Sequence, residues 1–226
     1  MASVSRFLVF DTSTDSLSVA VGAGGLDAAP LAQYSGVGGA QASATLIPQI
    51  QTLLAHAGWR LDELDAIVFG RGPGAFTGVR TACAVAQGLA FGADVPVLPV
   101  DTLLAVAEEA RWQRVQGGAA DADLSVLAML DARMDEVYSA AYQWSAASQT
   151  WQGLSDLQVS APEQVKATAA VLAGNVFEAY GPRLVAGAER LTALPTALAL
   201  LRLAPALWAS FNSRDTSATM GNKSLA

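Results

Sequence analysis

The chain has 226 residues, 52% of them hydrophobic and 15% charged, which is enough apolar material for one large or two small domains and excludes a largely disordered protein. Its formal net charge is −7, with 13 basic and 20 acidic residues, so the chain lacks the Lys and Arg surface that nucleic-acid binding requires. No apolar stretch reaches about 18 residues without a charge or a helix breaker, which argues against a membrane span, and the single cysteine, Cys83, suits the cytoplasm.

The first elements are predicted from hydrophobic periodicity. Residues 6–14 (RFLVFDTST) indicate a strand that ends in a turn, and residues 16–24 alternate apolar and polar side chains as the second strand of a hairpin. A weaker third strand is predicted at residues 31–39. Residues 42–57 then repeat apolar side chains at helical spacing, and Gly58 predicts the end of that helix.

A short strand at residues 66–69 leads into the loop GRGPGAFTGVR, which is followed by an alanine-rich run. Thr77 is expected to cap a helix that runs to about Phe91. A strand at residues 96–100 and a third helix to about Val115 complete an N-terminal lobe of residues 1–115.

Residues 116–194 are predicted to form a second, smaller α/β lobe. Two of its strands are joined by a turn around residues 131–135, within the segment LDARMDEVYSA. A helix at about 195–209 is expected to pack back on the first lobe. The tail, residues 210–226, is polar and without periodicity, and we expect it to be disordered.

Two glycine- and hydroxyl-rich turns are candidates for a nucleotide site. Asp11, Thr12 and Ser13 either contact phosphate or are ordinary turn residues that bond their own backbone. The second turn, GRGPGAFTGVR, lacks the ending of a Walker loop and the spacing of a dinucleotide fingerprint. Its glycines, Gly72 and Gly74, permit positive φ or close backbone approach, and free N–H groups near Thr77 would suit an anion. The alternative is a tight strand-to-helix connection.

The catalytic inventory is small. The only histidine, His56, lies in the last turn of a predicted helix and indicates a surface or capping residue. The carboxylate pairs Glu108–Glu109 and Asp121–Asp123 are interpreted as solvated charge.

The segments LVFDTST, IVFGRGPGAFTGVR and LDARMDEVYSA together resemble the TsaB family, also called YeaZ, over most of residues 6–205.

The resemblance implies an actin-like, sugar-kinase-like ATPase fold of two similar α/β lobes. It implies a role in making threonylcarbamoyladenosine at position 37 of tRNAs that read codons starting with A. The catalytic paralogue of this family, TsaD, carries two metal-binding histidines one helical turn apart. Thr102 and Val106 stand at those positions here, and neither is a good metal ligand.

The resemblance implies a scaffold or activating subunit that pairs with TsaD and the ATPase TsaE, and positions 102 and 106 indicate that it is non-catalytic and holds no metal. ATP, ADP and metal are assigned to the partners, and tRNA is met only through the complex. An independent ATPase or kinase of the same fold is the alternative, and a glycoprotease-type peptidase is a third that lacks a catalytic constellation. The helices that begin near Ala42 and Thr77 are expected to contact TsaD, or a second copy when TsaD is absent. Six side chains are proposed for that contact: Leu46, Ile50, Leu53, Val79, Ala82 and Ala86.

Overall fold

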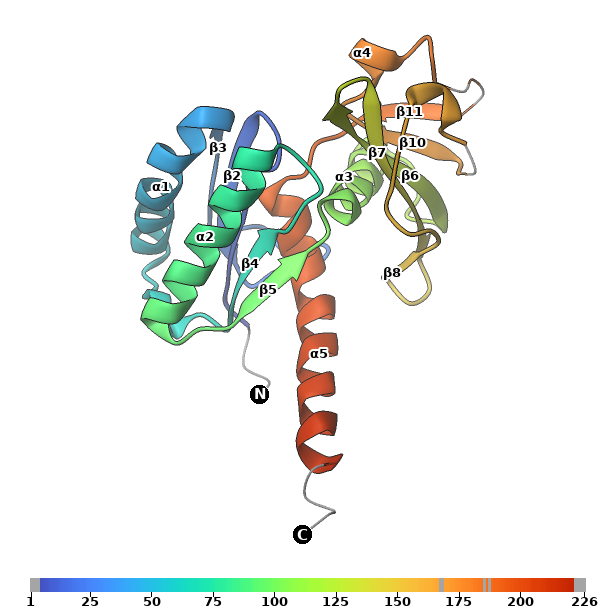
Figure 1. Cartoon of the computed structure of the whole chain (residues 1–226). Coiled ribbons are helices and arrows are strands. Elements are labelled where there is room, and N and C mark those ends of the chain that lie inside the picture. The colour runs from blue at the N-terminus through green and yellow to red at the C-terminus, as the bar shows by residue number, and fades with distance from the viewer. Residues whose placement is uncertain (1–4, 167–168, 185, 187, 222–226) are drawn as a thin grey trace.

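The computed structural model describes residues 5–166, 169–184, 186 and 188–221. It consists of two α/β lobes, with two helices between them (Figure 1). The first lobe is built on a sheet in the order β3-β2-β1-β4-β5. Its strands are β1 (Phe7–Asp11), β2 (Ser16–Gly22), β3 (Ala32–Val37), β4 (Ala66–Gly70) and β5 (Val97–Val100).

Strand β1 lies at the centre of this sheet and is buried on both faces. Leu8 and Phe10 face a core that includes helices α1 (Ala42–Ala57) and α2 (Phe76–Ala93). Phe7 and Val9 face helix α5 (Ala197–Gly221) on the other side. The strand is therefore a nearly continuous apolar run, as expected for a strand that helices cover on both faces.

The second lobe repeats the topology of the first. Its sheet has the order β11-β10-β6-β7-β8, with β9 also paired to β7. In each lobe three antiparallel strands come first. A further strand then pairs in parallel with the first strand, and the last strand pairs in parallel with that further strand. The strands are β6 (Leu124–Arg133), β7 (Glu136–Ser145), β8 (Thr150–Gly153), β9 (Gln158–Ser160), β10 (Val171–Gly174) and β11 (Glu189–Thr192). The repeated order confirms the prediction of two similar α/β lobes.

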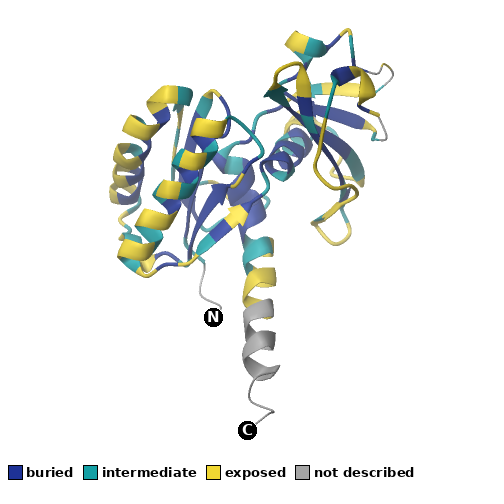
Figure 2. Cartoon of the chain, in the orientation of Figure 1, coloured by how far each residue is buried: buried dark blue, intermediate teal, exposed yellow. Residues whose placement is uncertain are grey.

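The helix that follows the last strand of each sheet packs largely against the sheet of the other lobe. Helix α3 (Thr102–Gln116) places Leu103, Val106 and Ala110 in a core with β6 and β7, and α5 packs on the first sheet, as predicted. The predicted boundary at residue 115 places α3 in the first lobe, whereas most of its buried side chains lie in the core of the second and Ala105 lies in the core of the first. Periodicity along one helix does not show which sheet the helix covers. Helix α3 is dark blue along most of its length in Figure 2, between the two lobes.

Two other predicted boundaries differ. Helix α2 starts at Phe76, with Ala75 at the N-cap position and no side-chain cap, so Thr77 does not cap it. Residues 210–221, predicted to be disordered, continue helix α5, because no glycine or proline interrupts residues 206–220. The rest of that predicted tail, residues 222–226, lies outside the described residues. Short helices α4 (Phe177–Tyr180), η1 (Gly39–Gln41), η2 (Leu61–Glu63) and η3 (Pro162–Gln164) complete the chain.

Two further local predictions are confirmed, the end of helix α1 and the turn between β6 and β7. Gly58 ends helix α1 in the left-handed conformation, with φ of 66°. The turn predicted at residues 131–135 joins β6 to β7. No helix within the described ranges is long and apolar enough to span a bilayer.

Candidate functional site: the cleft between the lobes

The two turns singled out in the sequence lie against each other at the edge of the first lobe. The hydroxyl of Thr12 donates a hydrogen bond to the carbonyl of Gly78 at 2.7 Å, and the N–H of Ala75 donates to the carbonyl of Ser13 at 2.7 Å. Glycine is required at this contact, since a Cβ on Gly78 would lie 1.8 Å from the carbonyl oxygen of Thr12. A Cβ on Gly74 would lie 2.4 Å from the oxygen of Ser13. The tight strand-to-helix connection is therefore confirmed.

We expect Gly78→Ala to lower the free energy of unfolding by about 1–3 kcal/mol, because its methyl group must displace backbone. Gly88→Ala is a matched control in the same helix. Gly88 is exposed with open space around its Cα, so the substitution should stabilise the protein by about 0.5–1 kcal/mol. Urea unfolding of both variants measures the difference. Equal effects would show that the contact between the two turns is loose.

Asp11 lies beneath this contact and not in an open cleft. Its side chain is buried, and Oδ1 accepts hydrogen bonds from the N–H of Ser13 at 2.8 Å and from the Ser13 hydroxyl at 2.6 Å. Oδ2 has no hydrogen-bond partner among the described residues and lies beside Gly70, where a Cβ would come within 1.8 Å of it. Burial raises the pKa of Asp11 to about 6, although the Ser13 hydrogen bonds oppose the rise.

Thr102 and Val106 are both committed to packing. The Thr102 hydroxyl accepts a hydrogen bond from the N–H of Gly72 at 3.0 Å, and the Thr102 N–H donates to the Gly72 carbonyl at 2.9 Å. Gly72 itself has a φ of +98°, the positive φ that the sequence allowed for. Val106 is fully buried in the core of the second lobe. These two positions do not offer a pair of metal ligands.

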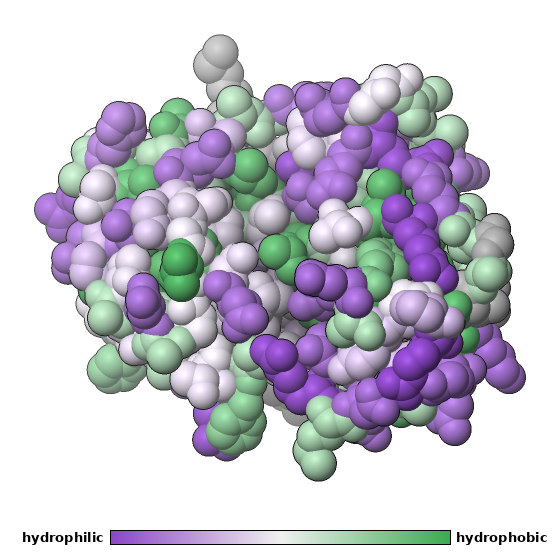
Figure 3. All heavy atoms as spheres, turned by 90° about the horizontal axis from the view of Figure 1, so that it is seen from above, coloured by the Kyte–Doolittle hydropathy of each residue, from purple (hydrophilic) through white to green (hydrophobic). Residues whose placement is uncertain are grey.

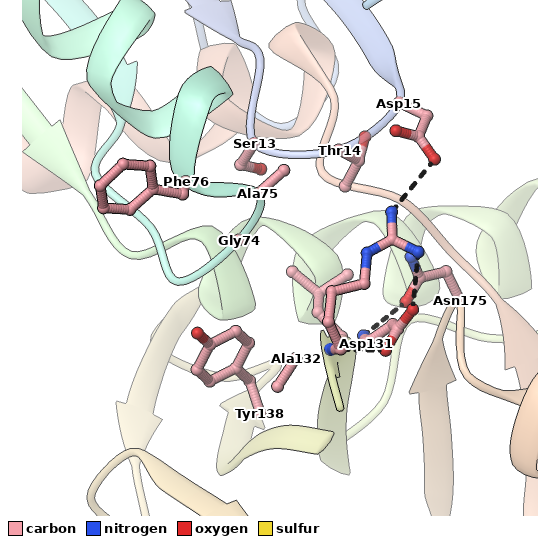
Figure 4. Close-up of a pocket in the computed structure, with 12 residues that line it drawn as sticks. Ser13, Thr14, Asp15, Gly74, Ala75, Phe76, Asp131, Ala132, Tyr138 and Asn175 are labelled. Carbon is pink, nitrogen blue, oxygen red and sulfur yellow. Dashed lines mark hydrogen bonds and ion pairs between the residues drawn. The ribbon is translucent and has the colours of Figure 1, made fainter. Parts of the chain in front are cut away.

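A cavity of about 160 Å³ lies where the two turns of the first lobe meet the second lobe (Figure 4). Its first-lobe wall includes Ser13 and Gly74. The facing wall comes from the β6–β7 hairpin and the turn after β10, and consists of Leu130, Asp131, Ala132, Arg133, Tyr138 and Asn175. Two of the candidate nucleotide-proximal residues, Ser13 and Gly74, line this cavity. Gly72 lines a neighbouring cavity, and Asp11, Thr12 and Thr77 line neither.

An ion pair crosses this cavity. The Arg133 guanidinium lies 3.2 Å from Oδ2 of Asp131 in the same hairpin and 3.6 Å from Oδ2 of Asp15 in the first lobe. Asp131 is held in turn by the Tyr180 hydroxyl, which donates to it at 3.0 Å, and its N–H donates to the side-chain oxygen of Asn175 at 3.0 Å. Sequence reasoning had assigned none of these residues to a site. The segment DARMDEVY was the available signal, because it carried the family resemblance.

The face of the molecule seen from above has a mixed character. Figure 3 shows apolar residues as separate patches among polar ones, without one continuous apolar surface. His56, the only histidine, is exposed in the last turn of α1. Within the described residues, no three His, Cys, Asp or Glu side chains are grouped to hold a metal ion.

A buried ionic cluster joins the lobes behind the cleft. The Glu108 carboxylate is fully buried and accepts hydrogen bonds from Arg111 of α3, from Arg202 of α5 and from the indole N–H of Trp151 on β8, all between 2.7 and 2.9 Å. Glu109 accepts a further bond from Arg202 at 2.9 Å. The interpretation of Glu108 and Glu109 as solvated charge is therefore wrong, because distant segments bring cations to them.

The predicted solvated pair Asp121–Asp123 also makes contacts. Asp121 forms an ion pair with the Arg111 guanidinium at 2.9 Å, and Oδ1 of Asp123 accepts the N–H of Ala146 at 2.8 Å. Asp121 keeps 35% of its side chain exposed, so it is only partly removed from solvent.

The predicted contact residues on α1 and α2 need a correction. The chain itself buries five of the six: Leu46, Ile50, Leu53, Ala82 and Ala86. Each helix turns its small or apolar face toward the sheet, so these side chains are unavailable to another chain. Val79 is half-buried. The outer faces of both helices are exposed (Figure 2), and on α2 they include Phe76, Ala84 and Phe91.

Comparison with known proteins agrees with this architecture. Residues 33–202 match the family model of TsaD, described as tRNA N6-adenosine threonylcarbamoyltransferase. The chain is 36% identical over 210 residues to the tRNA threonylcarbamoyladenosine biosynthesis protein TsaB of Haemophilus influenzae, which covers 87% of this chain and 84% of that protein. The chain belongs to the TsaB family. The TsaB of Escherichia coli is 38% identical over 160 residues, which is 71% of this chain and 64% of that protein.

Within the TsaB family, a solved structure has the same fold. YeaZ from Pseudomonas aeruginosa superposes with a TM-score of 0.78 at 37% identity, covering 91% of this chain and 93% of that one. The actin-like fold of two lobes, expected from the TsaB resemblance, is confirmed.

Proposed function

We propose that the chain is a non-catalytic subunit of the apparatus that makes threonylcarbamoyladenosine in tRNA. In this proposal it activates a catalytic protein of the TsaD type, and the ATPase TsaE joins the pair. The names of the relatives support the process. The state of positions 102 and 106 carries the non-catalytic assignment, because the Thr102 hydroxyl is bonded to Gly72 and Val106 is an aliphatic core residue.

The proposal also leaves metal and nucleotide to the partners, and the state of positions 102 and 106 supports this for the metal. A metal site needs several nitrogen, sulfur or oxygen ligands, and the two positions that hold it in the paralogue supply none that is free. The net charge of −7 supports a subunit that meets tRNA only within the complex, in the cytoplasm where tRNA is modified.

An independent ATPase or kinase is the second candidate, and Asp11 is the residue that favours it. A buried carboxyl with a raised pKa is a common feature of catalytic sites. However, Asp11 lines neither cavity beside the two turns, and the contacts of Ser13 and Gly78 cover it. This arrangement supports a structural role for Asp11.

The partner surface in this proposal is the outer face of α1 and α2. Phe91 is 92% exposed and Phe76 is 67% exposed, and Ala84 lies on the exposed face of α2 between them. Large exposed aromatic side chains are typical anchors of protein interfaces. The same face would form a homodimer when TsaD is absent.

We expect the purified chain, with tRNA, ATP and threonylcarbamoyl-adenylate, to yield no modified base, and the addition of TsaD and TsaE to restore modification.

The Ala84→Arg variant should keep the thermal melt of the native protein. It should lose association with TsaD, measured by light scattering, and should no longer activate it. Ala82→Arg is the contrasting variant in the same helix. Ala82 is fully buried, so arginine there should lower the melting temperature.

The two parts of the proposal fail separately. Modification by the chain without TsaD would contradict the non-catalytic assignment. A folded Ala84→Arg protein that still binds and activates TsaD would place the interface on another surface.

A further inference from the structure

A second cavity lies between the lobes, beside the first half of the loop that follows β4. Its volume is about 560 Å³, within the range of small-molecule sites. Arg71 and Asp101 line it from the first lobe, and Tyr142, Ser155 and Asp156 line it from the second. All of these residues are described by the structure, so the cavity can be analysed group by group.

This cavity contains charged groups of both signs, and some of their hydrogen-bonding atoms have no partner among the described residues. Nε of Arg71 donates to Oδ1 of Asp101 at 2.8 Å, and their side chains are 56% and 43% exposed. Among the described residues, the terminal N–H groups of Arg71 and the second oxygen of Asp101 have no further partner. Asp156 is exposed and, within the same ranges, has no hydrogen bond or ion pair.

Tyr142 adds a neutral hydrogen-bond donor to the charged groups of this cavity. The residue is only 8% exposed, and within the described residues its hydroxyl makes no hydrogen bond. The ring is buried, but the hydroxyl itself is not among the buried polar atoms that lack a partner, so it is open to the cavity and to a ligand there. Burial raises the pKa of Tyr142 well above its usual range, and the negative charge of Asp101 adds to the rise. The hydroxyl therefore stays protonated and is available as a donor.

We propose that this cavity binds a small zwitterion of the α-amino acid class. The ligand carboxylate accepts from Arg71 and from the Tyr142 hydroxyl, and the ammonium group lies against Asp156 and the free oxygen of Asp101. A simple anion would face two carboxylates, and a simple cation would face the guanidinium, so a ligand with both signs fits best. Leu103 and Leu157 line the same cavity, which favours a short apolar side chain. The inference does not depend on the proposed role in tRNA modification.

Titration calorimetry of the full chain with L-valine tests the proposal, with L-valine methyl ester and N-acetyl-L-valine as analogues that lack one charge each. We expect saturable binding of L-valine, and at least tenfold weaker binding of both analogues, since each loses a charge-assisted contact. Tyr142→Phe, which removes only the hydroxyl, should weaken binding about fivefold. Asp156→Asn should weaken it about tenfold.

Tyr138→Phe is the matched control, because Tyr138 lies on the same strand but lines the other cavity, and it should leave the affinity unchanged. Three results would overturn the proposal: no saturable binding of L-valine, equal binding of the methyl ester, or wild-type affinity in a folded Tyr142→Phe protein. Equal binding of the methyl ester would indicate a simple cation site instead.

Discussion

Replacing Glu108 by glutamine is expected to lower the free energy of unfolding by about 3–5 kcal/mol. The wild-type carboxylate is fully buried and neutralises parts of two guanidinium groups, those of Arg111 and Arg202, which are themselves almost fully buried. The amide keeps the shape of the side chain but removes the charge, so two cations are left in the core with less compensation. Their remaining partners, Asp121 and Glu109, are more exposed than Glu108.

Chemical denaturation at neutral pH measures this effect. Glu178→Gln is the control, because Glu178 is exposed and the same substitution there should change the stability by less than about 0.5 kcal/mol. A loss below about 1 kcal/mol for Glu108→Gln would mean that the cluster contributes little to holding α3, α5 and β8 together.

Replacing Asp11 by asparagine is expected to change how stability depends on pH. The pKa of Asp11 is raised from 3.8 to about 6 in the folded state, so folding favours the protonated form. Below pH 3.8 the carboxyl is protonated in both states and costs nothing. As the pH rises through about 6 the wild type loses stability from this group, about 3 kcal/mol in all, and the loss is complete about one unit above that pKa.

Asparagine stays neutral throughout, so the stability difference between Asp11→Asn and the wild type should move by about 3 kcal/mol in favour of the variant between pH 3 and pH 8. Urea unfolding of both proteins at several pH values gives this difference, in which the titration of all other groups cancels. Asp27→Asn, at an exposed position, is measured in parallel as the control substitution. A difference for Asp11→Asn that does not vary with pH would contradict the raised pKa.

Local features of this chain could be predicted because their signals lie within a few residues of each other. The helical repeat of residues 42–57 with Gly58 after it, and the turn between β6 and β7, are set by side-chain periodicity and by backbone conformations that few residues adopt. Gly72 and Gly74 were expected to permit positive φ or close backbone approach, and the structure shows a positive φ at Gly72 and a close approach at Gly74. The family motifs added the pairing of two lobes, which the repeated strand order confirms.

Only the tertiary structure decided the properties that depend on segments distant in the sequence. The sequence around Glu108 is typical of a solvated helix residue, and only the folded chain brings Arg202, 94 positions away, into contact with it. Ala82 and Ala86 lie on a small-residue face that suits either a partner or a sheet, and only the packing of α2 on the first lobe assigns that face to the core. The cavity beside Tyr142 needs walls from both lobes. Burial and ion pairing are properties of the assembled chain, because each depends on which surfaces meet, and periodicity along a single segment does not carry that information.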